Sequence, residues 1–337
     1  MERLSDSQLN TVIEQYGLNL LSLTVYDRLF KIDTLSGTYA LKKTDMSSQR
    51  VEQFTNIISQ LESQPLSLIP IIRTKYGDYV VEAEGAVFYL MPWIKNQLLD
   101  DEHERVKRLV TQTALLHRHT KRAQPDGGIV AEQLRNRWAR IEQFMEQFAD
   151  RSEHRLYPSP FEQQYLNSFH RLMTVSEDAR QQLNEWQQQY RDSGELSVIC
   201  HGRLQPNRVL STPESDYLTI FDDAYRASPC FDLAYFFRRL PYYVNGEAES
   251  YQHWLTLYEA HYTLSTADYY LLSAMLIFPE PLVSRTIDYT RRDDDQLEID
   301  AVNQWNFTKE HYEGLNAWAA TLVKDDISDA TGSNDNL

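Results

Sequence analysis

The residues best suited to chemistry lie between positions 201 and 223. A short apolar strand at 198–200 leads into a polar loop at 201–208, which Gly and Pro make irregular. The candidate site residues of this stretch are His201, Arg203, Asn207, Arg208, Asp222 and Asp223. A carboxylate can bind a metal ion or take a proton from a hydroxyl, whereas a guanidinium has only donors and stays charged. The carboxylates therefore decide which reactions this stretch can perform.

A hairpin and a helix must position these residues. The apolar segments 209–210 and 218–221 predict two strands joined by a turn at 211–215, so that Asp222 follows the second strand. The turn Ser228-Pro229 comes next, and Asp232 opens an apolar helix. The predicted order is strand, loop, hairpin and helix.

This order resembles the catalytic and metal-binding loops of the small-molecule kinases related to aminoglycoside phosphotransferases, in the protein-kinase-like superfamily. The matching residues are His201-Gly202, Asp222-Asp223-Ala224, Pro229 and Asp232-Leu233-Ala234. The resemblance implies an α+β, bilobal fold with a small antiparallel-sheet N-lobe and a larger, mainly helical C-lobe. It divides the chain into an N-lobe at 1–93, a C-lobe at 94–325 and a disordered tail at 326–337. In the C-lobe, residues 159–162 (Ser-Pro-Phe-Glu) have the pattern of a helix capping box.

Three positions depart from the family pattern. Arg203 stands where the family has its base Asp, Arg208 where it has the metal-binding Asn, and Ile220 where it has the metal-binding Asp. A guanidinium cannot accept a proton, and an isoleucine cannot bind a hard cation. The resemblance therefore implies a degenerate site, without catalytic residues and without a metal. Two alternatives stay open, because Asn207 is one residue from the expected ligand and Asp222 or Asp223 can supply carboxylate oxygens.

The N-terminal strands carry one candidate for nucleotide binding. Ala40 and Lys42 lie two residues apart on a predicted strand and share a face, as the family's adenine and phosphate contacts do. Met91 precedes Pro92 in the segment that resembles the hinge between lobes, so Lys42 and Met91 would line a nucleotide cleft. Two features oppose catalysis. No glycine lies between residues 23 and 30, and the helix predicted at 48–62 places no Glu toward Lys42.

The family resemblance predicts how the degenerate site is assembled. Lys42, Arg203, Arg208, Ile220 and Asp222 should converge although they are distant in sequence. We expect Arg203 to be buried and paired with Asp222 or Asp223, because a buried guanidinium without a partner is costly.

The resemblance also gives Asp232 a structural role. The corresponding Asp in the family accepts backbone N–H bonds from the catalytic loop.

Composition limits the partners and the compartment. The net charge of 33 − 49 = −16 opposes nucleic acid, and no apolar run approaches the ~20 residues of a membrane span. The polar N-terminus has no apolar signal core, so we expect synthesis in the cytoplasm without a signal peptide. Cys200 and Cys230 fit a reducing compartment as plain buried thiols.

Within the superfamily, the loop sequence His201-Gly202-Arg203 and the hinge Pro92-Trp93 look most like the spore-coat-associated CotS/YutH-like proteins, the YutH-like branch above all. This resemblance implies a protein of the bacterial endospore coat, whose partners are other coat proteins. The first hypothesis is a catalytically inactive scaffold that needs no cofactor. The alternatives are a divergent small-molecule phosphotransferase that uses ATP and Mg²⁺, and a nucleotide-binding switch without turnover.

Overall fold

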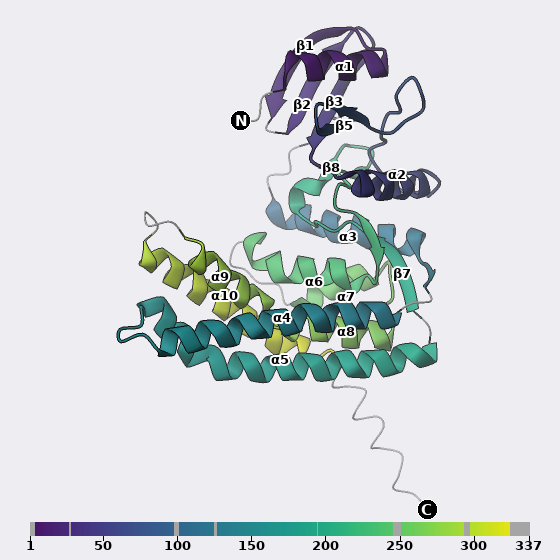
Figure 1. Ribbon diagram of the computed structural model, residues 1–337. Helices are drawn as coiled ribbons and strands as arrows, with labels where there is room; N and C mark the ends of the chain where they lie inside the picture. The colour runs from purple at the N-terminus through teal and green to yellow at the C-terminus, as the bar shows by residue number, and fades with distance from the viewer. Residues whose placement is uncertain are drawn as a thin grey trace, which may run out of the picture. The chain divides into compact units, whose positions relative to one another are not determined.

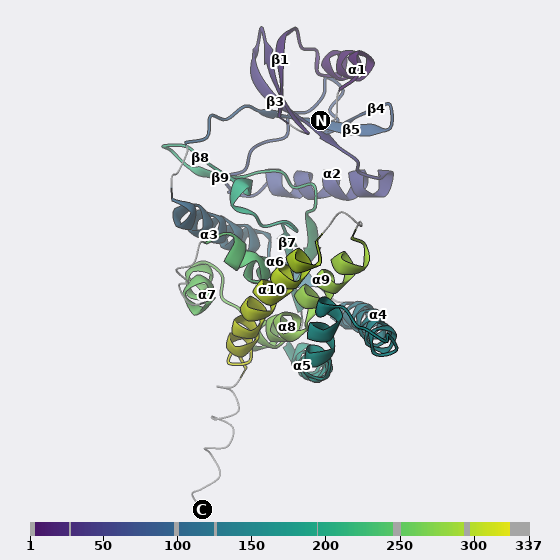
Figure 2. The ribbon, with the colours of Figure 1, turned by 90° about the vertical axis from the view of Figure 1, so that its left-hand side faces the viewer.

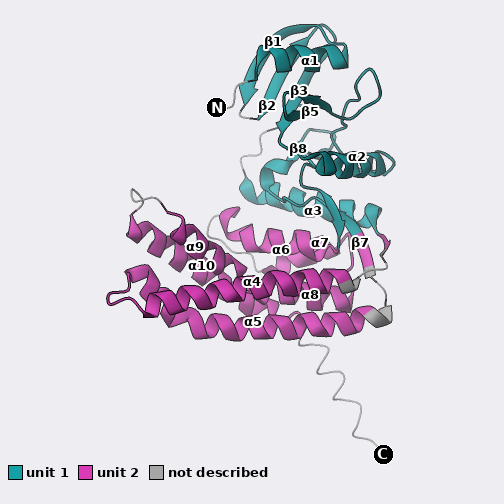
Figure 3. Ribbon diagram, in the orientation of Figure 1, with its two compact units in different colours: residues 1–121, 198–227 teal, residues 122–197, 228–337 magenta. Residues whose placement is uncertain are grey.

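The chain forms two compact units (Figure 3). Unit 1 consists of residues 1–121 and 198–227, and unit 2 of residues 122–197 and 228–337. The computed structural model describes residues 4–26, 28–97, 101–124, 127–193, 195–244, 251–292 and 297–323. The tail expected at 326–337 lies outside the described residues. Unit 1 contains the whole N-lobe expected at 1–93 and also the polar loop after residue 200.

Unit 1 is built on a five-stranded antiparallel sheet in the order β1-β2-β3-β5-β4 (Figures 1 and 2). The strands are β1 (Leu20–Tyr26), β2 (Leu29–Thr34), β3 (Gly37–Thr44), β4 (Val81–Ala83) and β5 (Ala86–Pro92). One face of the sheet carries a core of fully buried side chains. They are Phe30, Ile32, Leu41, Phe88 and Leu90, with Val12 of α1 (Asp6–Tyr16) packed among them. Buried and partly exposed residues alternate along β2, whereas β5 is buried on both faces.

The helix α2 (Ser48–Glu62) has the bounds predicted from the sequence. Ser47 accepts a hydrogen bond from the N–H of Arg50 and so caps its first turn. Its buried residues share one stripe and are Phe54, Ile57, Ile58 and Leu61. Arg50, four residues before Phe54 and so on the same side of this helix, belongs to the site described below.

The rest of unit 1 holds the polar loop. The strand β7 (Glu195–Cys200) pairs through its residues 198–200 with β10 (Tyr225–Ala227). Between them lie the 3-10 turn η1 (Pro206–Arg208) and the hairpin of β8 (Val209–Ser211) and β9 (Asp216–Leu218). The second hairpin strand starts and ends earlier than the predicted 218–221, and Ile220 has left the extended conformation, with a φ of +61°. The helix α3 (Glu102–Thr120) completes the unit, and the Thr120 hydroxyl accepts a hydrogen bond from the N–H of Ile199.

Unit 2 is mainly helical. Its elements are β6 (Arg122–Gln124), α4 (Gly127–Glu153), α5 (Pro160–Ser193), α6 (Cys230–Arg239), η2 (Leu240–Tyr242), α7 (Tyr251–Glu259), α8 (Thr266–Ile277), α9 (Glu280–Thr290) and α10 (Glu298–Ala319). Aromatic rings fill its core, for example Phe148 against Tyr165 with ring centroids 4.7 Å apart. In the part of the chain that the structure describes, no helix is long and apolar enough to cross a membrane.

The capping box predicted at the start of α5 is confirmed. The N–H of Glu162 donates to the Ser159 hydroxyl over 3.2 Å, and the N–H of Ser159 donates to the Glu162 carboxylate over 2.8 Å. Each bond satisfies a donor that would otherwise have no partner at the helix terminus.

Candidate functional site

The β3–β5 pairing sets one wall of the site. Lys42 lies opposite Tyr89 and Ala40 opposite Met91, so these four side chains share a face of the sheet. Ala40, Tyr89 and Met91 are buried, whereas Lys42 is partly exposed. Lys42 and Met91, the predicted nucleotide contacts, therefore lie on one face. The charge of Lys42 also acts on the carboxylate of Asp222, from the segment after β9.

His201 holds the polar loop against the segment that follows β9. Its ring is fully buried, with Nε2 3.1 Å from the carbonyl oxygen of Thr219. The backbone N–H of Arg203 donates to Nδ1 over 3.4 Å. Because Nδ1 accepts, Nε2 carries the proton and donates to Thr219. The imidazole thus joins two segments of backbone, and both of its nitrogens are used in doing so.

Gly202 allows a close approach of two backbones. Its φ is +78°, and a Cβ at this position would lie 2.1 Å from the carbonyl oxygen of Asp223. Any side chain would force the loop at 201–208 away from the Asp222-Asp223 segment. The glycine therefore brings the two polar stretches together.

Ile220 has an unusual backbone conformation. Its φ is +61°, in the left-handed region that β-branched residues rarely adopt. Among L-residues, Asp and Asn tolerate this region better, since their short polar side chains can bond locally. The backbone at position 220 is therefore better suited to the Asp that the family resemblance expects than to the Ile that this chain has.

The carboxylate of Asp222 is committed to Tyr89. The Tyr89 hydroxyl donates to Asp222 Oδ1 over 2.5 Å. Burial raises the pKa of Asp222, although the Tyr89 hydrogen bond and the charge of Lys42 act in the opposite direction. Burial and the neighbouring Asp222 charge also raise the pKa of Tyr89, so that its hydroxyl remains a donor.

Arg50 of α2 fixes the backbone of the same segment. Its Nε and Nη2 donate to the carbonyl oxygen of Asp222 over 2.9 and 2.6 Å, and Nη2 also donates to that of Ala224 over 2.7 Å. A planar guanidinium can make this set of bonds because its donors form a rigid fork. Asp222 is therefore held through both its side chain and its main chain.

The predicted pairing of Arg203 is wrong. Arg203 is exposed rather than buried, so solvent stabilises its charge and no carboxylate is required. Arg208 is partly buried instead, and its Nε is buried without a hydrogen-bond partner among the described residues. Burial lowers the pKa of Arg208, and the nearby charge of Arg203 lowers it further. The two arginines thus lie close enough to repel each other, and Arg208 also interacts electrostatically with Asp222 and Asp223.

The convergence predicted for the degenerate site is found within unit 1. Electrostatic interactions connect Asp222 with Lys42 and Arg208, and Arg208 with Arg203. Ile220 lies two residues before Asp222, on the same turn.

The remaining predicted residues lie as follows. Asn207 is exposed in η1, and Asp223 is exposed next to Asp222. Asp232 lies in the first turn of α6 and is fully buried, while its proposed bonds to the loop stay a prediction. Cys200 and Cys230 are buried thiols, as expected.

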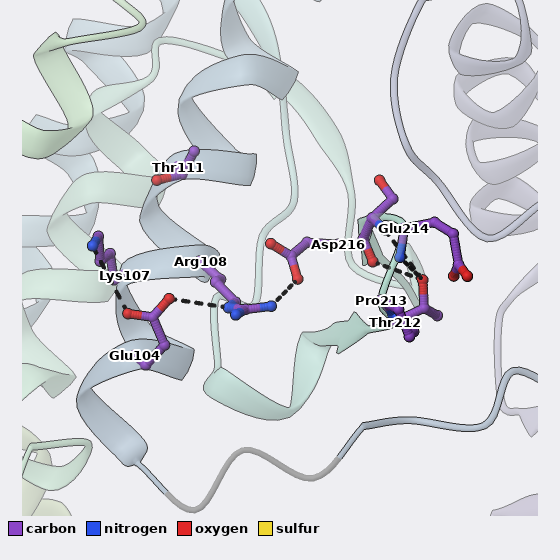
Figure 4. Close-up of a pocket in the computed structure, with 9 residues that line it drawn as sticks. Glu104, Lys107, Arg108, Thr111, Thr212, Pro213, Glu214 and Asp216 are labelled. Carbon is purple, nitrogen blue, oxygen red and sulfur yellow. Dashed lines mark hydrogen bonds and ion pairs between the residues drawn. The ribbon is translucent and has the colours of Figure 1, made fainter.

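A hollow in unit 1, apart from the site described above, lies beside α3 and the β8–β9 hairpin (Figure 4). It has a volume of about 310 Å³ and is lined by Glu104, Lys107, Arg108, Thr111 and residues 212–216. Arg108 bridges it, with Nε 3.2 Å from Glu104 and Nη1 2.7 Å from Asp216. Lys107 pairs with Glu104 over 3.8 Å. Both cations that line this hollow are therefore paired with carboxylates.

Sequence reasoning missed Arg50 and Tyr89. The family pattern predicts a Glu on α2 as the partner of Lys42 and gives no reason to expect an Arg that binds main-chain carbonyls. Tyr89 lies in an apolar run and reads as core, but a buried tyrosine hydroxyl normally has a partner.

The fold of this chain is similar to that of solved aminoglycoside phosphotransferases, whose structures match it over nearly its whole length. The aminoglycoside phosphotransferase from Alicyclobacillus acidocaldarius is 17% identical and has a TM-score of 0.76, with coverage of 96% of this chain and 98% of that chain. Spectinomycin phosphotransferase is 12% identical with a TM-score of 0.57, covering 93% and 99% of the two chains. Amicoumacin kinase is 13% identical with a TM-score of 0.55, covering 92% and 94%. At these identities the likeness concerns the fold alone.

The chain belongs to the family described as "spore coat putative kinase YutH", whose model matches residues 10–312. The resemblance of the loop sequence to the YutH-like branch is thereby confirmed. No curated protein matches the chain in sequence.

Proposed function

We propose that this protein is a catalytically inactive, kinase-like component of the bacterial endospore coat with a scaffolding role in coat assembly. The observation that carries the proposal is the commitment of Asp222. Its carboxylate accepts a hydrogen bond from the Tyr89 hydroxyl, and its main-chain carbonyl oxygen accepts two from the Arg50 guanidinium. The Asp222 carboxylate, which interacts electrostatically with Lys42, is therefore already hydrogen-bonded to Tyr89.

The donor set around Asp222 does not suit Mg²⁺. This ion needs near-octahedral oxygen ligands. Ile220 and Arg208, which stand at the family's ligand positions, offer no oxygen, and Arg208 adds a positive charge. Arg203 cannot serve as the base, and loss of general-base help alone costs about 10²–10⁴ in rate. These features together favour a site without phosphoryl transfer.

One observation favours a second candidate, a nucleotide-binding switch without turnover. Lys42 is partly exposed and shares its sheet face with Ala40 and Met91, as nucleotide contacts in the family do. Under the third candidate, a divergent small-molecule phosphotransferase, side-chain oxygens of Asn207, Asp222 or Asp223 would have to hold the metal. The three candidates differ in their requirement for nucleotide and for metal.

A thermal-shift titration with ATP separates them. The scaffold is expected to show no shift with ATP, either with or without Mg²⁺. A shift that needs no Mg²⁺ would indicate the switch, and a Mg²⁺-dependent shift would indicate the enzyme. The Lys42→Met variant is the control, because a shift that persists without this ammonium does not come from the predicted cleft.

The coat role has its own test in a spore former that makes this protein. Lys42→Met should leave the protein composition of the extracted coat unchanged, because a scaffold needs no nucleotide. Gly202→Ala, which forces apart two backbones of unit 1, should reduce deposition of the protein in the coat. Defective coats with Lys42→Met would contradict a purely structural role.

A further inference from the structure

The strand β1 is a free edge of the unit 1 sheet. In the strand order β1-β2-β3-β5-β4 it pairs only with β2, and among the described residues no other segment pairs along its outer side (Figure 2). Five of its seven residues are exposed. Leu21 and Tyr26 among them are 63% and 52% exposed, which is high for large apolar side chains. The outer N–H and C=O groups of such a strand form a template for another strand.

The opposite edge of the same sheet is protected. β4 has only three residues and carries the exposed Glu82. The helix α1 packs against it, and the Gln8 side chain donates to the carbonyl oxygen of Ala83. Short length, charge and a covering helix are the usual protections of an edge strand. β1 has none of these, since its sequence, LLSLTVY, contains no charge and no proline. Its one irregularity, between Leu20 and Ser22, leaves the register regular from Ser22 to Tyr26.

The regular part of β1 is complementary to itself. Leu23 lies opposite Ile32 and Val25 opposite Phe30, so both face the core side of the sheet. Their neighbours Ser22, Thr24 and Tyr26 face the other side, and each carries a hydroxyl. In an antiparallel pair of two such strands centred on Thr24, apolar residues would therefore lie opposite apolar residues and hydroxyl-bearing residues opposite hydroxyl-bearing residues.

We propose that β1 pairs antiparallel with β1 of a second copy of this chain, around a two-fold axis at Thr24. Leu23 then lies beside Val25 of the other copy, Ser22 beside Tyr26, and Thr24 beside Thr24. A two-fold interface must be complementary to itself, which this strand is. A net charge of −16 opposes self-association elsewhere on the surface, whereas β1 brings no charge to the contact. The pairing joins two five-stranded sheets into one continuous sheet.

The position of Thr24 on the axis gives a specific test. In Thr24→Lys two ammonium groups face each other, and in Thr24→Glu two carboxylates do. The dissociation constant of the dimer should therefore be about fivefold higher, or more, for each variant alone than for the parent. An equal mixture of the two variants places Lys opposite Glu and should restore the dimer. Sedimentation velocity over a concentration series measures the dissociation constant, with a dimer at twice the 39.5 kDa chain mass. Asn56→Lys, exposed on α2, is the matched control for the added charge and should dimerise like the parent.

Two further measurements separate loss of pairing from loss of folding. Thr24 lies opposite Lys31 on β2, so Thr24→Lys should melt slightly lower than Thr24→Glu while both remain folded by circular dichroism. Thr24→Cys should form a disulfide between copies on mild oxidation, because directly opposed residues of paired strands are within disulfide distance. A parent protein that sediments as a monomer at every concentration would overturn the proposal. So would a dimer that both charged variants leave unchanged.

Discussion

The hydroxyl of Tyr89, on β5, donates a hydrogen bond to the carboxylate of Asp222, on the segment after β9. The bond joins residues 133 positions apart in sequence. It occupies a carboxylate two residues after Ile220, the position at which the family resemblance expects a metal-binding Asp. The bond thereby ties the segment after β9 to the five-stranded sheet of unit 1.

The pH dependence of stability should report the burial of Asp222. Burial raises its pKa above the ordinary 3.8, so the folded state holds the proton more tightly than the unfolded state. The ionised carboxylate therefore costs stability at neutral pH, and this cost disappears as the pH falls through the raised pKa. Asp222→Asn keeps an oxygen for Tyr89 and cannot ionise. We expect it to melt higher than the parent at pH 7, with the difference shrinking toward about pH 4.

The control for this experiment is Asp223→Asn, at the exposed neighbour. It should shift the melting temperature little at any pH. A difference between Asp222→Asn and the parent that stays constant with pH would show that the carboxylate is not penalised by burial.

Arg50→Met removes three hydrogen bonds to main-chain carbonyls at once. The carbonyl oxygens of Asp222 and Ala224 lose their donors, and we expect a loss of about 1–3 kcal/mol in the free energy of unfolding. Arg28→Met is the matched control, because Arg28 forms an exposed ion pair with Asp45, and such pairs contribute at most about 1 kcal/mol. Chemical denaturation measures both. Equal losses would mean that Arg50 does not hold the segment.

Local patterns predicted local structure well. The apolar stripe and polar termini gave α2 its bounds at 48–62, and residues 159–162 form the capping box that their spacing indicates. Each depends on residues within a few positions of one another. The kinase-like fold was predicted from the resemblance of the loop motifs, because the sequence of a single strand does not determine the order of strands in a sheet.

Contacts between distant segments were harder to predict. Arg203 was expected to be buried and paired with Asp222 or Asp223, but a loop residue can point to solvent while its neighbour His201 is fully buried. Arg50 binds carbonyl oxygens, and every residue has one, so no sequence pattern marks its targets. These interactions depend on the tertiary path of the backbone and become visible only with the structure.

The left-handed backbone at Ile220 should be measurable as strain. A residue with a Cβ costs roughly 1–2 kcal/mol in this region, whereas glycine pays nothing. Ile220→Ala and Ile220→Gly both remove the apolar side chain, and only the glycine variant also removes the Cβ. We expect Ile220→Gly to be the more stable of the two, the reverse of the usual order. If the alanine variant unfolds at higher denaturant, position 220 does not hold a strained conformation.

Gly202 and Gly77 form a matched pair for the close approach of backbones. Both have positive φ, at +78° and +95°, but a Cβ at Gly77 meets nothing within 4 Å, whereas at Gly202 it would meet the Asp223 carbonyl. Gly77→Ala should cost only the backbone strain of roughly 1–2 kcal/mol. Gly202→Ala should cost clearly more, by thermal or chemical unfolding. Equal losses would show that the loop moves aside without penalty.

Restoring the base alone should not restore a kinase. Arg203→Asp supplies a carboxylate, but Ile220 and Arg208 still offer no oxygen to Mg²⁺, and Asp222 remains bonded to Tyr89. Since Arg203 is exposed and repels Arg208, its replacement should change the melting temperature little. The triple variant Arg203→Asp, Arg208→Asn, Ile220→Asp returns the base and the two metal ligands that the family pattern has at these positions, and an Asp suits the backbone at position 220.

We therefore expect a Mg²⁺-dependent thermal shift with ATP in the triple variant and none in Arg203→Asp. ATP turnover is measured for both, with the parent as the blank. Turnover by Arg203→Asp would contradict this account, because it would mean that Asn207, Asp222 or Asp223 already holds the metal and that only the base is missing. A triple variant that folds but shows no shift would indicate that the Tyr89–Asp222 hydrogen bond still prevents metal binding. Adding Tyr89→Phe to the triple variant should then produce the Mg²⁺-dependent shift.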